Sequence, residues 1–503
     1  MAEQDIIPGK QHSLWIDTSE EGDFPYLNED KKVEVAVIGG GITGVTTAFL
    51  LKQAGMKVAL IEAGRLCSGT TGFTTAKVTS QHGFLYPALK RKFGSERTAQ
   101  YFKAQEEAKE FIAALVKNEK IECDFAREAS YNYTEKESGI KAVEEFAQVF
   151  KSVGANIELV EKTSLPFPIK AAVKLENQIR FHSRKYVLEL AKKIPGDGSF
   201  VFESTRALGI IPEHPYEIIT DRGRVKAEKV VEATQFPFYD RRFFFARLYP
   251  STSYVLGVYV KDVTAEGMYF SQDDTKHSIR YQPSEKGPIL IVSGSGHTSG
   301  QGGDTMRYYK QVEKYARQRF DFKSVDYFWS AEDYQTADLL PFIGKRPVSR
   351  GTYVATGFNK WGMTNGTLAA LINSDLILGE KNPYANLFNP SHIYPHASIS
   401  TAFSKGLNIS NQYLKGYLSR HPKEKPSQLD DGEAKLIKDN GIKASFKDEN
   451  GNEHEVSATC THFFCRLNWN NAELTWDCPC HGSRFSKDGG VIHGPAKKDL
   501  RSG

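Results

Sequence analysis

The sequence predicts an α/β fold with a mixed antiparallel β-sheet subdomain, followed by an all-β C-terminal domain. Residues 31–62 read as strand, tight turn, helix and strand, and residues 200–283 are rich in β-branched and aromatic residues separated by turns. Beyond residue 427 the pattern changes to short strands and turns. The expected parts are an N-terminal segment (1–30), a first domain (31–415) with an interleaved sheet subdomain (155–335), a linker (416–426) and a last domain (427–503).

The composition excludes several classes of protein. The chain has 503 residues, enough for two or three domains, and its formal net charge of +4 is too small to indicate a nucleic-acid partner. The first 17 residues lack the apolar core of a secretory signal, and glycines interrupt the most apolar early stretch, residues 33–51. We therefore expect a soluble, cytoplasmic protein without a membrane span.

A glycine-rich turn follows the first predicted strand, Val33 to Ile38. The segment Gly39-Gly-Gly-Ile-Thr-Gly44 matches the pattern G-x-G-x-x-G and lies directly before a predicted helix. In this pattern Gly39 permits the tight turn, Gly41 lets the backbone approach a pyrophosphate, and Gly44 allows close packing of helix on strand. The helix N-terminus then offers free N–H groups to the phosphates, which makes a dinucleotide site the favoured interpretation.

Glu62 supports the dinucleotide interpretation. It follows the second predicted strand, residues 58–61, where a carboxylate can accept hydrogen bonds from an adenosine ribose. A glycine-rich turn without a ligand is the alternative. The strand, helix, second strand and acid nevertheless all lie where a dinucleotide site requires them.

The remaining elements are predicted from periodicity and turn residues. Helices are expected at 95–120, 139–153, 305–320 and 365–378, a turn at 221–223, and a strand at 353–356 that enters a second glycine turn. Another glycine-rich stretch, residues 294–300, follows a strand-like run at 289–292. Because more glycines continue where a helix should begin, we expect a loop near the first cofactor rather than a second nucleotide site.

Residues 30–385 resemble the D-amino-acid-oxidase-like flavoprotein superfamily. The similar segments are 39–62, 68–77, 230–237, 340–344, 355–358 and 361–364. The resemblance implies a Rossmann-like domain that binds FAD, with the late glycine turn close to the flavin. The residues that it implies for FAD binding are Gly39, Gly41, Gly44, Glu62, Thr74, Thr75, Gly357, Phe358, Gly362, Met363 and Thr364.

The same resemblance suggests catalytic candidates. The predicted strand at 277–281 and the stretch around His297 occupy the region that covers the substrate side of the flavin in the family. Arg280 could pair with a substrate carboxylate, and Tyr281 or His297 could hydrogen-bond to the substrate. An exposed strand arginine and a structural histidine are the alternatives. Further candidates near the flavin by motif position are Thr75, Lys77, Asp338 and Trp361.

Four of the six cysteines lie within residues 460–481, together with two histidines. Cys460-Thr-His462 is followed by Cys478-Pro-Cys-His481, so each segment offers one thiolate and one imidazole. A Rieske [2Fe–2S] cluster takes two thiolates on one iron and two imidazoles on the other. A zinc site is the alternative, although zinc ribbons usually present C-x₂-C hooks.

The segments around these residues resemble Rieske loops, which implies Cys460, His462, Cys478 and His481 as cluster ligands. Cys465 and Cys480 match the pair that forms a disulfide in respiratory-type Rieske proteins. Because disulfides are unusual in a reducing cytosol, free thiols are the alternative. Respiratory Rieske proteins usually carry a tyrosine where this chain has Phe485, and losing that hydroxyl near the cluster should lower its potential.

The chain as a whole resembles bacterial fusions of a flavin domain of this superfamily with a C-terminal Rieske domain. The resemblance implies an FAD-dependent oxidoreductase that oxidises a C–N bond of a small amine or amino acid. Electrons would then pass through the [2Fe–2S] cluster to an unknown external acceptor. An NAD(P)H-driven electron-transfer reductase and a non-catalytic redox sensor are the alternatives.

Overall fold

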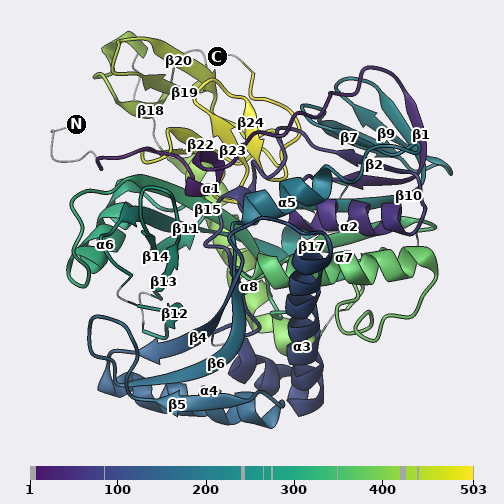
Figure 1. Ribbon diagram of the computed structural model, residues 1–503. Helices are drawn as coiled ribbons and strands as arrows, with labels where there is room; N and C mark the ends of the chain where they lie inside the picture. Colours follow the sequence, from purple (N-terminus) through teal and green to yellow (C-terminus); the bar gives the residue numbers. More distant parts are fainter. Residues whose placement is uncertain are drawn as a thin grey trace.

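The computed structural model describes residues 7–83, 85–239, 244–263, 265–273, 276–347, 349–392, 394–419, 426–438 and 441–501. Two large sheets form the first part of the chain, and two small sheets form the C-terminal domain. Figure 1 shows the C-terminal domain in yellow, beside the end of strand β15 (Tyr327–Thr336) and the short helix α1 (Leu14–Asp17). The predicted fold class is confirmed.

The first sheet has eight strands and carries the glycine-rich turn. Its central strand is parallel to both of its neighbours, as expected when helices cover the faces of a sheet. The strands in spatial order are β16 (Phe342–Lys345), β17 (Thr352–Thr356), β10 (Arg224–Gln235), β1 (Lys31–Ile38), β2 (Val58–Ile61) and β7 (Phe200–Phe202), with β8 (Ala207–Ile211) and β9 (Tyr216–Thr220) paired beside β10.

Two helices pack on one face of this sheet and begin near the carboxyl ends of its strands. Helix α2 (Ile42–Gln53) begins at the glycine turn, and α7 (Gly362–Leu378) begins at the second one. Figure 1 shows the two helices side by side. They pack so closely that a Cβ on Gly366 would lie 2.7 Å from Thr43 Oγ1, so only glycine fits there without a shift.

The second sheet has nine strands and forms the opposite wall. It includes strands from outside residues 155–335, whereas β7 to β10 inside that range belong to the first sheet. The strands in spatial order are β15, β11 (Leu248–Tyr259), β14 (Ile289–Thr298), β13 (Ser278–Gln282), β12 (Met268–Ser271), β4 (Ala126–Thr134), β6 (Ala171–Arg180) and β3 (Lys77–Val78), with β5 (Ile157–Val160) beside β6.

The predicted helices are present, with ends that differ by a few residues. The helix predicted at 95–120 is the longer part of α3 (Leu85–Asn118), in which Gly94, with a non-helical φ of 79°, joins two helices at a kink. The other predicted helices include α4 (Ile140–Ser152) and α6 (Met306–Arg317). The helix before Gly94, α1, α5 (Ser183–Ala191) and α8 (Pro395–Leu418) were not predicted.

The stretch at 294–300 differs from the loop that we expected. Residues 294–298 continue strand β14 and pair with β11, so the glycines occupy a sheet rather than a loop. A side chain on Gly296 would lie 2.4 Å from the carbonyl oxygen of Thr252, which explains a glycine within the strand. The next helix, α6, begins only at Met306.

The C-terminal domain is built from short antiparallel strands. One small sheet contains β18 (Ala434–Lys438), β19 (Ile442–Lys447) and β20 (Glu453–Ser457), and the other contains β21 (Asn468–Asn470), β22 (Thr475–Asp477), β23 (Arg484–Ser486) and β24 (Val491–His493). Most of the expected linker, residues 420–425, lies outside the described residues, and its first residues belong to α8. Among the described helices, none has both the length and the apolar character needed to cross a membrane.

Candidate functional site

One large cavity lies between the two large sheets and the C-terminal domain. Its volume is about 1030 Å³, and its walls come from the glycine turn (39–43), from strand β14 (293–297) and from the C-terminal domain (491–494). A cavity of this size suits a ligand at least as large as a drug molecule. Three parts of the chain that are far apart in sequence therefore share one binding space.

The glycine turn has the geometry that the dinucleotide pattern requires. Gly39 has a φ of 109°, and a Cβ on Gly44 would lie only 1.8 Å from the carbonyl oxygen of Gly39. Neither position accepts a side chain, so the turn keeps bare backbone at the N-terminus of α2. This cradle fits the pyrophosphate of a dinucleotide.

Glu62 lies at the carboxyl end of β2 and lines the cavity. Its two carboxylate oxygens accept hydrogen bonds from the backbone N–H groups of Gly40, at 2.7 Å, and Gly64, at 2.8 Å. Burial raises the pKa of Glu62. A carboxylate has about four acceptor positions, so this one is fixed in place with capacity left for a ribose.

Eight of the eleven residues implied for FAD binding line the cavity. The three others stand behind the wall: Gly44 packs α2 on β1, Gly357 makes a turn with a φ of 75°, and the Thr364 hydroxyl lies 3.1 Å from His82 Nε2. The eight that line the cavity are Gly39, Gly41, Glu62, Thr74, Thr75, Phe358, Gly362 and Met363.

The three catalytic candidates lie in different surroundings. His297 lines the cavity, and its Nε2 lies 2.8 Å from the hydroxyl of Tyr254. Arg280 is fully buried outside the cavity lining and donates a 2.6 Å hydrogen bond to the carbonyl oxygen of Ala76. Tyr281 is also buried away from the cavity, in the apolar core beneath β13.

The further candidates divide in the same way. Thr75, Lys77 and Trp361 line the cavity, whereas Asp338 is buried 3.0 Å from His392 and outside the lining. The Lys77 ammonium donates a 2.8 Å hydrogen bond to the carbonyl oxygen of Tyr269. Burial, with a contribution from Arg280, lowers the pKa of Lys77 well below its usual value.

Sequence reasoning missed two lysines that line the cavity, Lys276 and Lys360. The Lys360 ammonium donates a 2.9 Å hydrogen bond to Ser253 Oγ. Burial lowers the pKa of Lys360, Asp333 opposes that shift, and the charge of Lys276 lowers it further. The charge of Lys276 thus disfavours the charged form of Lys360. Both residues have positive φ, 47° and 71°, in turns that no sequence motif marks.

His82 is another cavity residue that no motif indicated. Its ring stacks on Trp361 at 4.6 Å, and its Nδ1 lies 2.8 Å from the hydroxyl of Tyr101. Burial lowers the pKa of His82 to about 3, so the imidazole is neutral at physiological pH. His82 therefore holds Trp361 against the cavity without adding charge.

The N-terminal segment also contributes to this region. Trp15 is fully buried, and its indole N–H donates a 2.6 Å hydrogen bond to the carbonyl oxygen of Thr74. Its ring lies 5.2 Å from the Arg280 guanidinium. The segment thus closes the cavity wall from behind and covers Arg280.

In the C-terminal domain, the four expected ligand residues come together. Cys460 and Cys478 are buried in one apolar cluster, and the rings of His462 and His481 have centroids 5.2 Å apart. Hydrogen bonds with Cys478 first and also with Ser483 lower the pKa of Cys460 to about 7. Two thiols and two imidazoles are the donor set of a [2Fe–2S] cluster of the Rieske type, and these side chains fit it.

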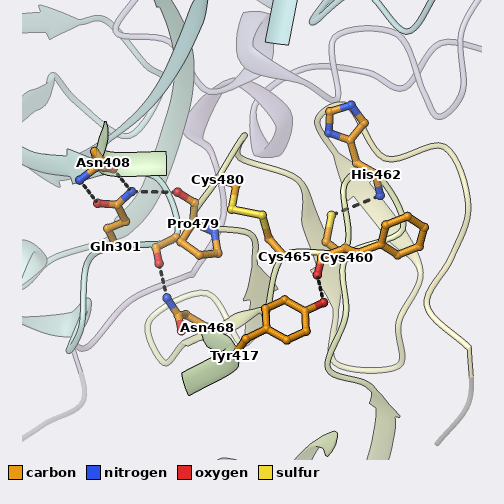
Figure 2. The surroundings of a disulfide bond; sticks show 11 residues. Gln301, Asn408, Tyr417, Cys460, His462, Cys465, Asn468, Pro479 and Cys480 are labelled. Atoms are coloured by element: carbon orange, nitrogen blue, oxygen red, sulfur yellow. Dashed lines mark hydrogen bonds between the residues drawn. A yellow bond between two sulfur atoms is a disulfide. The ribbon is translucent and has the colours of Figure 1, made fainter. Parts of the chain in front are cut away.

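Cys465 and Cys480 form a disulfide in the structure, in place of the two free thiols that were the alternative. Both sulfurs lie within 4.8 Å of Cys478 Sγ, which places the disulfide directly beside an expected ligand. Figure 2 shows the bond between the two loops, with Gln301 of the first domain donating a 2.8 Å hydrogen bond to the carbonyl oxygen of Pro479. The disulfide loop is therefore held both internally and by the neighbouring domain.

The two histidines expected as ligands face aromatic residues of the first domain. Phe236 lines the cavity, and its ring lies 6.2 Å from that of His462. The Tyr334 hydroxyl donates a 3.0 Å hydrogen bond to the carbonyl oxygen of His481. His493 lines the cavity from the C-terminal domain, with Nδ1 3.2 Å from Glu332 Oε1. One layer of side chains thus separates the cavity from the ligand residues.

Comparisons with known families identify both domains. Residues 34–376 match the family described as FAD dependent oxidoreductase, and residues 420–502 match the Rieske [2Fe-2S] domain. A Bacillus subtilis (strain 168) protein named as a Rieske 2Fe-2S iron-sulfur protein, YhfW, is 36% identical over 100% of this chain and 99% of its own length. Gamma-glutamylputrescine oxidoreductase of Escherichia coli (strain K12) is 22% identical over 74% of this chain and 89% of its own length.

Solved structures share the fold of the first domain. Glycine oxidase from Geobacillus kaustophilus superposes with a TM-score of 0.61 and 18% identity, over 72% of this chain and 100% of its own. L-amino acid deaminase from Proteus vulgaris gives a TM-score of 0.60 and 15% identity, over 74% of this chain and 100% of its own.

Proposed function

The chain belongs to the family of FAD-dependent oxidoreductases and carries a Rieske [2Fe–2S] domain, and from this we propose that it oxidises a C–N bond of an amino acid. The electrons then pass from the reduced flavin through the cluster to an external acceptor. FAD and a [2Fe–2S] cluster are its two cofactors. When bound, the flavin supplies a two-electron acceptor for the substrate, and the cluster supplies a one-electron carrier.

The wall shared by the two domains is the observation that carries the electron route. Phe236 belongs to the cavity lining and also faces His462, and Tyr334 is hydrogen-bonded to the backbone of His481. No bulk of protein separates the substrate cavity from the ligand residues at this point. This arrangement favours a direct outlet for electrons over discharge to a partner at the cavity itself.

The charges at the end of the cavity formed by the second sheet favour a substrate with a carboxylate. Lys276 and Lys360 line it, together with Lys77, whose ammonium is hydrogen-bonded to Tyr269 and Ser278 rather than to an acid. Asp333 is the acid in the lining near Lys360, and it accepts backbone hydrogen bonds. A substrate carboxylate would relieve the repulsion between Lys276 and Lys360, whereas an amine with no acidic group would add to it.

The test is an anaerobic substrate screen that follows the absorbance of flavin and cluster together. Each amino acid is paired with the amine formed by its decarboxylation, so that only the carboxylate differs. We expect amino acids to reduce first the flavin and then the cluster, and their amines to reduce neither. Equal reduction by an amine would contradict the substrate proposal, and a cluster that stays oxidised beside reduced flavin would contradict the electron route.

Lysine variants locate the carboxylate site. Lys276→Met or Lys360→Met should raise KM for the amino acid by about 10- to 100-fold, the equivalent of one charge-assisted hydrogen bond. Lys345→Met is the matched control, since Lys345 is exposed at the end of β16 and does not line the cavity. A rise in KM with the control as large as with the two cavity variants would refute this placement.

A further inference from the structure

An exposed apolar face lies beside the expected cluster ligands, and none of its residues lines the cavity. We call it the Phe463 face. It combines the end of α8 with the loop that follows Cys460, and its exposed fractions reach 78% at Leu418 and 63% at Phe464. Soluble proteins rarely gather such side chains without a binding partner. Its members are Tyr413, Leu414, Tyr417, Leu418, Phe463 and Phe464.

Direct contacts join the two parts of the Phe463 face. The Tyr417 hydroxyl donates a 2.8 Å hydrogen bond to the carbonyl oxygen of Phe464, and Figure 2 labels Tyr417 close to Cys465. The rings of Tyr413 and Tyr417 lie 5.0 Å apart, and the Arg466 guanidinium lies 4.8 Å from the Tyr417 ring. A side chain on Gly416 would lie 2.8 Å from Arg466 Cβ, so α8 lies directly on the cluster domain. The face is one continuous surface.

Phe463 connects this surface to the cluster ligands. Its ring centroid lies 4.5 Å from that of His462 and 5.6 Å from that of His481, and 44% of the residue is exposed. It therefore contacts both imidazoles on one side and solvent on the other. A protein that docks on the Phe463 face would come within one side chain of the ligands.

The segments that form the face carry positive charge. Residues 403–418 and 457–472 contain no aspartate or glutamate, although the chain has 61 acidic residues in all. The basic residues nearest the face are Lys415, Arg466 and Lys498, whose carbonyl oxygen accepts a hydrogen bond from Thr461, with Asp499 following it. An apolar centre with a basic border is complementary to a partner that has an apolar centre and an acidic border.

We propose that the Phe463 face docks an acidic one-electron carrier protein, which is the external acceptor of this enzyme. One electron leaves the reduced cluster and reduces the oxidised metal centre of the carrier, and no proton or bond changes hands. This proposal rests on the outward electron route proposed above. The contact of Phe463 with both imidazoles favours a redox partner, because electron transfer needs closeness to the cluster. Binding of a lipid surface or of a second copy of the chain does not need it.

Two forms of one carrier test the proposal. Cytochrome c is a basic one-electron acceptor, and succinylation of its lysines makes it acidic while the haem stays the same. The holoenzyme is reduced with stoichiometric dithionite and mixed with each form in a stopped-flow instrument, so no substrate is needed. The affinity of the oxidised enzyme for each oxidised form is measured by analytical ultracentrifugation.

We expect the acidic form to bind more tightly and to oxidise the cluster about tenfold faster at low ionic strength, with the difference lost in high salt. The charge-reversed variant Lys415→Glu/Lys498→Glu should lose this preference. Lys141→Glu/Lys151→Glu changes net charge equally on the exposed side of α4 and should keep it. The EPR spectrum of the cluster reports whether each variant is folded. If a variant is not folded, the salt dependence of the wild-type reaction with the two cytochrome forms tests the proposal instead.

Other outcomes would overturn the proposal. These are equal or faster reaction with the basic form at low salt, the same loss of preference in the α4 control, a dimer that Lys415→Glu/Lys498→Glu dissociates, and sedimentation of the enzyme with phosphatidylglycerol vesicles. Because dithionite replaces substrate, a failed substrate screen leaves this result intact. A cluster that exchanges electrons only with the acidic carrier supports the docking face whatever reduces the flavin.

Discussion

Replacing Phe485 by tyrosine adds one hydroxyl to the apolar core that surrounds the cluster ligands. Phe485 is fully buried on β23, opposite Trp476 of β22, in the same cluster of buried residues as Cys460 and Cys478. The neighbouring Ser483 already places a hydroxyl against Cys460. A tyrosine at 485 would supply a second donor in a region that excludes water, where hydrogen bonds to charged sulfur are strong.

The size of the effect follows from the charge on the cluster. Reduction adds one negative charge, so a donor to sulfur stabilises the reduced state more than the oxidised state. A hydrogen bond to a charged group contributes about 1.5–3 kcal/mol, and we take a difference of about 1–2 kcal/mol between the two states. Since 59 mV and 1.36 kcal/mol each correspond to a factor of ten for one electron, Phe485→Tyr should raise the potential by about 40–90 mV.

The measurement is a redox titration of the cluster followed by EPR in wild type and variants. Ser483→Ala is the matched control, because it removes a donor where Phe485→Tyr adds one, and it should lower the potential. Thermal unfolding shows whether the added hydroxyl is accommodated. A folded Phe485→Tyr variant whose potential does not rise would refute the view that the phenylalanine sets a low potential.

Two further predictions concern the domain contact and acid stability. Gly300 has a φ of 70°, and a Cβ there would lie 2.6 Å from the backbone of Cys478 and Pro479, so Gly300→Ala must move the cluster loop and slow cluster reduction in stopped-flow experiments. Gly303→Ala, with a φ of 65° and open space, meets the same backbone strain without the clash and should transfer electrons normally. Burial lowers the pKa values of His82 and His182 to about 3 and of His277 to about 4. The unfolded chain therefore binds more protons below about pH 6.5, and the free energy of unfolding should fall on acidification by up to about 1.4 kcal/mol per pH unit for each histidine. Denaturant unfolding between pH 7 and pH 4 should show a shallower fall for His82→Gln and the wild-type fall for exposed His12→Gln; identical slopes in all three proteins would contradict this assignment.

Features that depend on a few consecutive residues could be predicted from the sequence. The glycine turn, the strand before it and Glu62 form one local unit, whose spacing determines its geometry. The paired Cys-x-His and Cys-x-x-His segments likewise carry their own geometry, since each loop supplies two ligands. Which residues of the long second sheet face the cavity depends instead on contacts between distant segments.

Arg280 illustrates that limit. It lies two positions after Ser278, so both point to the same face of β13, and Ser278 lines the cavity. Trp15 and the backbone of Ala76 cover that face at Arg280, and nothing in the sequence indicates that the N-terminal segment packs there. Lys276 and Lys360 were missed for the opposite reason, because turns with positive φ bring them into the cavity.

The shared wall of the cavity also bears on how the enzyme matures. Residues 491–494 complete the flavin cavity, yet they are synthesised more than 400 residues after the glycine turn that opens it. A nascent chain can therefore form the first domain while its cavity still lacks that wall. The cavity is therefore complete only once the C-terminal domain has folded against the first, so the last residues of the chain take part in enclosing a ligand whose cradle lies near its beginning.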